Sequence, residues 1–219
     1  MSALPRFVAL YALMYAAFGV SSPFLPAFFE GRGLGPGQLG ILFGAGTAIR
    51  LIAGPLVGRV ADLTGALRAV LAICALLAAA VALNLLSAPP FTLLLLTSLA
   101  HSAALAPTTT LANALALGAA QPCAARPAFE YGWVRGTGSA VFVIGTLVSG
   151  QVVAPWGLAS IIILQAALLV GASGAATLVP LAERDESVTA AQRMGRAQGF
   201  LLMALLCAAA LPLARGLRT

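Results

Sequence analysis

Arg50 lies inside an apolar run, residues 38–57. A guanidinium within a membrane-spanning segment costs at least about 2.5 kcal/mol on insertion scales, so it must face a partner or a water-filled cavity. Two interpretations are open for this residue. Arg50 contacts an anionic or hydroxylated ligand in a central cavity, or it pairs with backbone carbonyls and extends toward the interface. We take it as the first candidate substrate-binding residue.

Arg135, Ser139 and Phe142 form a second candidate group, at and within a later apolar run, residues 136–153. Positions 135 and 142 are two helical turns apart and therefore share a face, with Ser139 between them. A guanidinium and an aromatic ring on one face can bind a carboxylate or hydroxyls and stack on a flat ligand. The alternative is an Arg that anchors the helix at the cytoplasmic interface and a Phe that faces lipid.

His101 and Asn113 are polar residues in the apolar run 91–117. Histidine titrates near neutral pH and can relay protons, although a lone histidine among small residues is often structural. Asn113 can bond a ligand or another helix. Acidic residues lie only at the edges of the apolar runs, whereas proton-coupled carriers usually bind the proton on a buried carboxylate. These edge residues are Glu30, Asp62 and Glu130.

Catalytic, metal and cofactor sites are not predicted. The three cysteines, Cys74, Cys123 and Cys207, show no CxxC or Cys/His spacing. His101 is the single histidine, and its neighbour Ser102 should point to a different face of the helix. The spans contain no paired carboxylates. We therefore expect neither an enzyme nor a metal site.

The elements that position these residues are membrane-spanning helices. The chain has 219 residues, of which 61% are hydrophobic and only 8% charged, against about a quarter charged in soluble domains. Runs of 18 or more apolar residues indicate transmembrane helices. Six such spans are predicted, at 7–29, 38–57, 69–86, 91–117, 136–153 and 157–181.

The predicted fold class is an all-α integral membrane protein, in which residues 1–181 form a six-helix bundle. Residues 182–198 are predicted to be a cytoplasmic central loop. The apolar stretch that follows, 199–214, is too short to cross a core of about 30 Å at 1.5 Å per residue. Residues 199–219 are therefore predicted to be an incomplete seventh helix, or alternatively a segment that lies at the membrane interface.

The arginines predict the orientation of the chain in the membrane. All twelve basic residues are Arg, and they occur singly between apolar runs, which is typical of loop anchors and not of a nucleic-acid interface. An N-terminus in the cytoplasm leaves Arg32 alone on the outer side. It places eight on the inner side: Arg6, Arg59, Arg68, Arg126, Arg135, Arg184, Arg193 and Arg196.

Spans two and five are both rich in glycine, which allows close helix packing in lipid. Glycine-rich helices at the same place in two three-helix units are typical of transporters built from inverted repeats. The glycines of span two are Gly40, Gly44, Gly54 and Gly58, and those of span five are Gly136, Gly138, Gly145 and Gly150.

Three segments carry a resemblance to a known family. The sequence FGVSSPFLP at 18–26 resembles the end of the first helix of lactose-permease-like transporters. The sequence GRVADLTGALR at 58–68 resembles the loop signature of the major facilitator superfamily, with Asp62 or Thr64 available to cap the third span. The sequence FEYGWVRGTGS at 129–139 resembles the entry to the fifth helix, closest to the phenylpropionate-permease branch. The signature residues are Gly58, Asp62, Gly65 and Arg68.

The resemblance implies the N-terminal half of a proton-coupled symporter of twelve helices, which binds a small organic acid or sugar between two six-helix halves. Arg135 matches the position of a sugar-binding Arg, and Phe142 matches that of an aromatic residue that stacks on the sugar. Asn113 stands where the branch often has Asp. The implied partners are the bilayer of the cell (inner) membrane, a small substrate, protons and a second half. The alternative is a truncated, non-transporting remnant or a partner half with a structural role.

Overall fold

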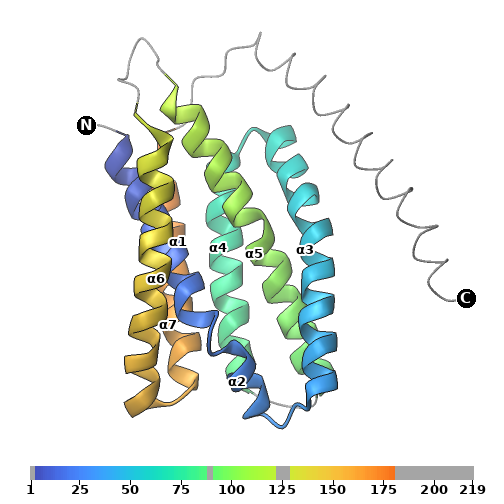
Figure 1. The fold of residues 1–219 in the computed structure, drawn as a ribbon. Helices are drawn as coiled ribbons and strands as arrows, with labels where there is room; N and C mark the ends of the chain where they lie inside the picture. The colour runs from blue at the N-terminus through green and yellow to red at the C-terminus, as the bar shows by residue number, and fades with distance from the viewer. Residues whose placement is uncertain (1–2, 88–90, 122–128, 181–219) are drawn as a thin grey trace, which may run out of the picture. The chain divides into compact units, whose positions relative to one another are not determined.

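The computed structural model describes residues 3–87, 91–121 and 129–180. All regular structure in that part of the chain is helical, and six helices are long and apolar enough to cross a membrane. They are α1 (Leu4–Ser21), α3 (Pro36–Thr64), α4 (Leu67–Asn84), α5 (Phe91–Ala120), α6 (Tyr131–Trp156) and α7 (Ala159–Leu178) (Figure 1). The predicted all-α membrane fold is confirmed. The predicted central loop and partial seventh helix lie outside the described residues.

The first predicted span consists of two helices, so the prediction of one continuous span over 7–29 is wrong. α1 ends at Ser21, and a short helix, α2, covers Leu25–Glu30. Pro23 lies in the turn between them, where its ring and missing N–H disfavour a continuous helix, although α3, α5 and α6 each contain a proline. Pro26 is tolerated in the first turn of α2, where an N–H would have no helical partner.

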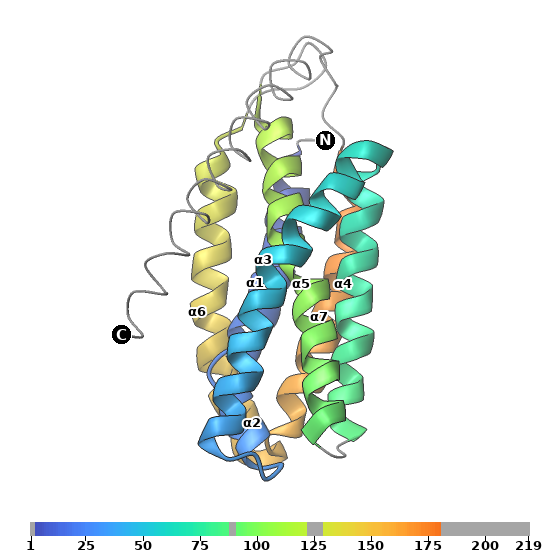
Figure 2. The same cartoon turned by 90° about the vertical axis from the view of Figure 1, so that its right-hand side faces the viewer.

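The six long helices follow one another in the chain as two units of three, α1–α3–α4 and α5–α6–α7, and the main packing contacts run between the two units. α1 packs against α6 and α7, α5 packs against α3 and α4, and α4 packs against α7 (Figures 1 and 2). In the two units α1 corresponds to α5, α3 to α6 and α4 to α7. Exchanging the units therefore turns the α1–α6 contact into α5–α3 and the α1–α7 contact into α5–α4. Inverted repeats related by a pseudo-two-fold axis give this pattern.

α3 and α6 are the least buried of the long helices. In each of them 17% of the most apolar window is buried, against 44% in α1 and α4. Their outer faces are apolar: Leu63 of α3 is 77% exposed and Trp156 of α6 is 78% exposed. Side chains of this kind suit contact with lipid or with another apolar bundle, because neither competes for hydrogen bonds.

The glycines of α3 and α6 divide into two groups. Gly145 makes a predicted close approach, because an added Cβ would lie 3.0 Å from the carbonyl oxygen of Ala16. Gly46, which is not among the predicted glycines, is also close to a neighbour, with an added Cβ 3.2 Å from the hydroxyl of Ser102. A residue with a side chain would push the helices apart at these points. Others would meet no atom of the described chain within 4 Å, and these are Gly37, Gly40, Gly44, Gly58, Gly132 and Gly136.

The signature segment 58–68 is largely helical and not a loop, and Gly58 does not mark a helix crossing. α3 continues to Thr64, and Gly65 ends it with a φ of 67°, a left-handed conformation that glycine adopts without strain. The Thr64 hydroxyl donates to the Val60 carbonyl at 2.9 Å and does not cap α4. Ala66 occupies the N-cap position of α4 instead.

Arginines hold the carbonyl ends of two helices. Arg68 donates to the Val179 carbonyl at 3.0 Å and Arg6 to the Leu178 carbonyl at 3.1 Å, so α1 and α4 both contact the end of α7. At the other end of the bundle Arg32 donates to the Leu85 and Leu86 carbonyls. A cation at a helix C-terminus satisfies free carbonyls and complements the helix dipole. Arg68, a signature residue, therefore fixes the end of the bundle.

Candidate substrate-binding site

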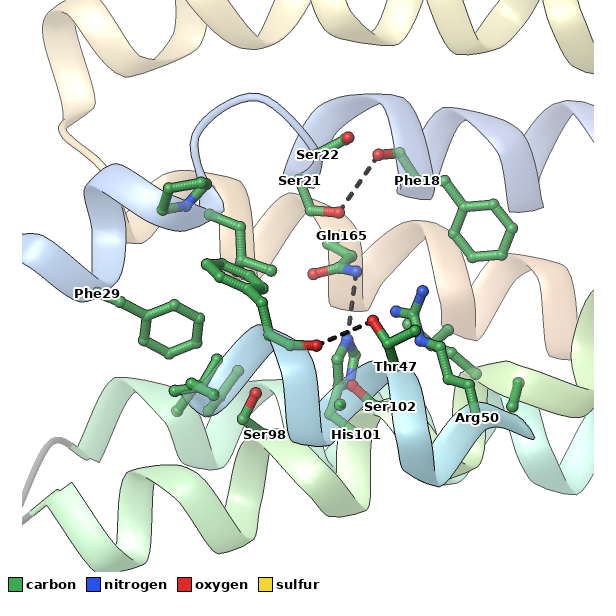
Figure 3. Close-up of a pocket in the computed structure, with 18 of the residues that line it drawn as sticks. Phe18, Ser21, Ser22, Phe29, Thr47, Arg50, Ser98, His101, Ser102 and Gln165 are labelled. Atoms are coloured by element: carbon green, nitrogen blue, oxygen red, sulfur yellow. Dashed lines mark hydrogen bonds between the residues drawn. The ribbon is translucent and has the colours of Figure 1, made fainter. Parts of the chain in front are cut away.

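A cavity of about 540 Å³ lies between the broken end of α1, α2 and the middle of α3, α5, α6 and α7. Its wall combines aromatic rings with many polar side chains, several of which point into one space (Figure 3). The aromatic residues are Phe18, Phe29, Phe43 and Phe142. The polar residues are Ser21, Ser22, Thr47, Arg50, Ser98, His101, Ser102, Thr109 and Gln165.

The cavity wall includes Arg50 from α3 and Phe142 from α6. Arg50 is the one lining residue with a permanent charge, and its guanidinium lies on the same side as Thr47 (Figure 3). The Thr47 hydroxyl donates to the Phe43 carbonyl at 2.9 Å. Arg50 is exposed, so its guanidinium is accessible to an anion, with which it can form charge-assisted hydrogen bonds. The predicted group of Arg135, Ser139 and Phe142 is divided, because Phe142 lines this cavity whereas Arg135 and Ser139 do not.

His101 and Gln165 form a buried polar pair on the cavity wall, 6% and 3% exposed. His101 Nδ1 lies 3.0 Å from the carbonyl oxygen of Ala78 on α4, and Nε2 lies 3.4 Å from Gln165 Nε2 on α7. The dashed line in Figure 3 marks the second contact. Gln165 Oε1 is buried and has no hydrogen-bond partner.

His101 and Ser102 both line the cavity, although successive residues of a helix point in different directions. The cavity meets α5 along its length and is wide enough to reach two successive side chains. No carboxylate lines this cavity in the described chain. Nor do three His, Cys, Asp or Glu side chains gather anywhere in residues 3–87, 91–121 and 129–180. Cys74 is a buried free thiol, and the other two cysteines lie outside those ranges.

Arg135, Ser139 and Asn113 lie outside the cavity wall, in or beside a second polar cluster. Arg135 donates from Nη1 to the hydroxyl of Tyr15, and its guanidinium carbon lies 4.9 Å from the centre of that ring. The Ser139 hydroxyl donates to the Arg135 carbonyl at 3.4 Å. Asn113 Oδ1 accepts from Tyr11 at 2.6 Å and from Tyr131 at 3.0 Å. Asn113 thus joins α5 to α1 and α6.

An aromatic ladder along α1 connects the two clusters. Phe18 lines the cavity and packs edge-on against Tyr15 at 5.6 Å between ring centres. Tyr15 in turn stacks on Tyr11 at 5.7 Å. The three residues follow the i, i+4, i+7 spacing of one helix face. A row of rings therefore runs from the cavity toward Arg135 and Asn113.

Residues 4–211 match the family model described as the MFS_1 like family. The chain belongs to the MFS_1 like family. Neither a curated protein nor a solved structure matches it. Family membership and six apolar helices together make this chain a membrane protein of the transporter type, in agreement with the resemblance of its three motifs.

Several site residues of this MFS_1 like protein were missed in the sequence. Gln165 is the one amide side chain within span six, and that polarity in an apolar run was a signal. The spacing of Tyr11 and Tyr15 indicates that they share a helix face, but it does not indicate which residues of other helices they contact. Tyr131 lay in a segment assigned to a loop.

Replacing Asn113 by leucine in this MFS_1 like protein should destabilise the bundle by about 2 kcal/mol. The substitution leaves two tyrosine hydroxyls without their acceptor, and each unsatisfied buried polar group costs about 1–3 kcal/mol. The measurement is SDS-induced unfolding in detergent, followed by far-ultraviolet circular dichroism. Asn84→Leu is the matched control, because the Asn84 amide donates only to a carbonyl of its own helix. Equal stability of both variants would show that Asn113 does not join the helices.

Proposed function

We propose that this MFS_1 like protein is the N-terminal half of a proton-coupled secondary transporter for a small organic acid or sugar-like substrate. The observation that supports this most directly is the cavity whose wall includes Arg50 of α3 and Phe142 of α6. Ligand pockets commonly measure 300–1,000 Å³ and combine apolar walls with a few polar groups. A cavity of about 540 Å³ fits a molecule of one ring with a short side chain.

An aromatic carboxylate is the substrate class that we favour within this proposal. Arg50 offers two parallel N–H donors to a carboxylate, which makes the contact short and directional. Phe18 and Phe142 line the same cavity and give a flat ring apolar faces on which to stack. Serine and threonine hydroxyls on α1, α3 and α5 would serve the hydroxyl groups of a sugar-like molecule.

Arg135, Ser139 and Asn113 complete the proposed site as a second polar layer. They lie along the same ladder of rings that begins at the cavity. We propose that Arg50 and Phe142 hold the substrate in this conformation, and that Arg135 contacts it after release from Tyr15. Alternating access requires groups of both kinds, because the substrate meets different layers as the bundle opens toward opposite sides.

A second six-helix half is the partner that the proposal requires. Alternating access in such transporters is rocking of one bundle against another around a shared site. α3 and α6 carry apolar faces that the described chain leaves exposed, and glycines of both helices have no neighbour within 4 Å. Small residues of this kind allow close approach of another helix.

The proposed orientation puts the N-terminus in the cytoplasm, with the protein in the cell (inner) membrane. Arg6 and Arg68 meet at the end of α7, so the N-terminus and the end of the sixth span share one side. Arg59 lies near the end of α3 that leads to Arg68, whereas Arg32 lies at the opposite end. The positive-inside rule assigns the arginine-rich end to the cytoplasm. Arg135 is also among the described residues. The remaining arginines predicted on the inner side lie outside them, and these are Arg126, Arg184, Arg193 and Arg196.

Binding of benzoate tests the proposal without requiring transport. The purified 219-residue chain in lipid nanodiscs should bind benzoate in equilibrium dialysis, and benzamide, which has the same shape without the charge, should bind at least about tenfold more weakly. Tighter binding of methyl β-galactoside than of benzoate would move the substrate class to sugars. Failure of both probes to bind at millimolar concentration would contradict the proposed substrate site.

A further inference from the structure

The hydrogen bonds of His101 dictate where its ring carries a proton. Nδ1 lies 3.0 Å from the Ala78 carbonyl oxygen, which only accepts, so Nδ1 must carry hydrogen. In the neutral ring Nε2 is then an acceptor, and it faces the Gln165 amide nitrogen at 3.4 Å. This arrangement directs the Gln165 carbonyl oxygen away from the ring. That oxygen is left buried with no donor.

Protonation of the His101 ring requires Gln165 to offer Nε2 a hydrogen-bond acceptor instead of a donor. The imidazolium donates from both nitrogens, so Nε2–H would face the amide N–H groups of Gln165, donor against donor. A half-turn of the amide removes the conflict, because Oε1 then accepts from Nε2–H. The same turn gives the unpartnered oxygen its donor and moves the amide N–H groups to the place that the oxygen had occupied.

We propose that His101 is a proton-binding site of this protein and that the Gln165 amide turns over when the proton binds. Gln165 is one of the residues that line the cavity, and the proton changes the place of its buried oxygen, beside the cavity, from a hydrogen-bond acceptor to a donor. The site needs no carboxylate. His101 can therefore bind a proton beside a cavity that no carboxylate of the described residues lines.

The charges around His101 couple this site to an anion. Arg50 on α3 is the one permanently charged side chain that lines the same cavity. Cys74 is one turn before Ala78 on α4, and Glu30 on α2 is exposed; neither lines the cavity. The positive Arg50 opposes a second positive charge on His101. A carboxylate bound to Arg50 cancels that opposition, so proton and anion favour each other's binding reciprocally. This coupling rests on the proposed function, whereas the proton site does not.

Nitrogen NMR of the histidine ring tests the proton site directly, because His101 is the single histidine of the chain. The full chain, labelled with ¹⁵N-histidine in nanodiscs, should show a neutral ring with hydrogen on Nδ1 and a doubly protonated ring on acidification. Gln165→Leu should lower the ratio of protonated to neutral ring about threefold or more, since charge-assisted hydrogen bonds are the stronger ones. Gln165→Glu should raise it about tenfold or more, since an opposite charge lies beside the ring. Gln151→Leu, at an exposed glutamine of α6, should change nothing.

Two results would overturn the proton site: hydrogen on Nε2 of the neutral ring, or an unchanged ratio in both Gln165 variants. The coupling is tested by adding benzoate, which should increase the protonated fraction at a fixed pH where benzamide does not. Benzoate that binds without changing the ring overturns the coupling and leaves the proposed function standing. Benzoate that does not bind counts against the proposed function, and the ligand-free titration still decides the proton site.

Discussion

Replacing Arg50 by glutamine should weaken benzoate binding about 30-fold or more. Arg50 is the one permanent charge on the cavity wall. Removing one partner of a desolvated charge pair costs about 2 kcal/mol or more, and 1.4 kcal/mol is a factor of ten. Glutamine keeps a hydrogen-bond donor at the same place but cannot balance a carboxylate. Equilibrium dialysis of the purified variant in nanodiscs measures the effect.

The same substitution on the same helix provides the control for this result. Arg59 lies on α3 outside the cavity and is exposed, so Arg59→Gln should bind benzoate as the wild type does. Arg50→Lys should fall between wild type and Arg50→Gln, because an ammonium keeps the charge without the two parallel donors. Misfolding is not the expected cause of the loss, since removing an intramembrane charge favours insertion. Wild-type affinity of Arg50→Gln would show that the anion does not bind at this guanidinium.

The number and type of the helices could be predicted because charge-free runs are a direct consequence of the membrane environment. The lengths of the helices could not be predicted, because hydropathy identifies only the part of a helix that lies in the apolar core of the membrane. α3 continues through Arg59 and Asp62 to Thr64, residues whose polarity favoured a loop. The break at Pro23 was equally hidden, because apolar residues on both sides of it read as one span.

The candidate site was predictable only where one residue carried the signal. Arg50 stood out because a charge inside a span has few explanations, and the structure puts it on the cavity wall. Gln165 and Tyr11 acquire their meaning from partners on other helices, His101 and Asn113, which are 64 and 102 positions away in the chain. Periodicity indicates which residues share a face, but not which helix that face meets.

Replacing Gly19 by alanine should destabilise the bundle by about 2 kcal/mol or more. Gly19 lies on α1 against the backbone of α6, where an added Cβ would overlap the carbonyl oxygen of Phe142. The neighbour is backbone and cannot turn aside, so the two helices must separate. Overpacking of this kind typically costs 1–3 kcal/mol. Separation would also lengthen the 3.1 Å hydrogen bond from the Thr146 hydroxyl to the Gly19 carbonyl. SDS-induced unfolding followed by circular dichroism measures the change.

Gly136→Ala on α6 provides a control of opposite sign. An added Cβ there meets no atom within 4 Å, and alanine exceeds glycine in helix propensity by about 1 kcal/mol, so stability should be kept or increased. The backbone of Phe142 contacts Gly19, and the same residue lines the cavity. Gly19→Ala should therefore also weaken benzoate binding, whereas Gly136→Ala should not. A Gly19→Ala chain as stable as the wild type would mean that α1 and α6 do not meet this closely. Phe142 would then no longer be held in place by α1, and the position of its ring on the cavity wall would lose its structural basis.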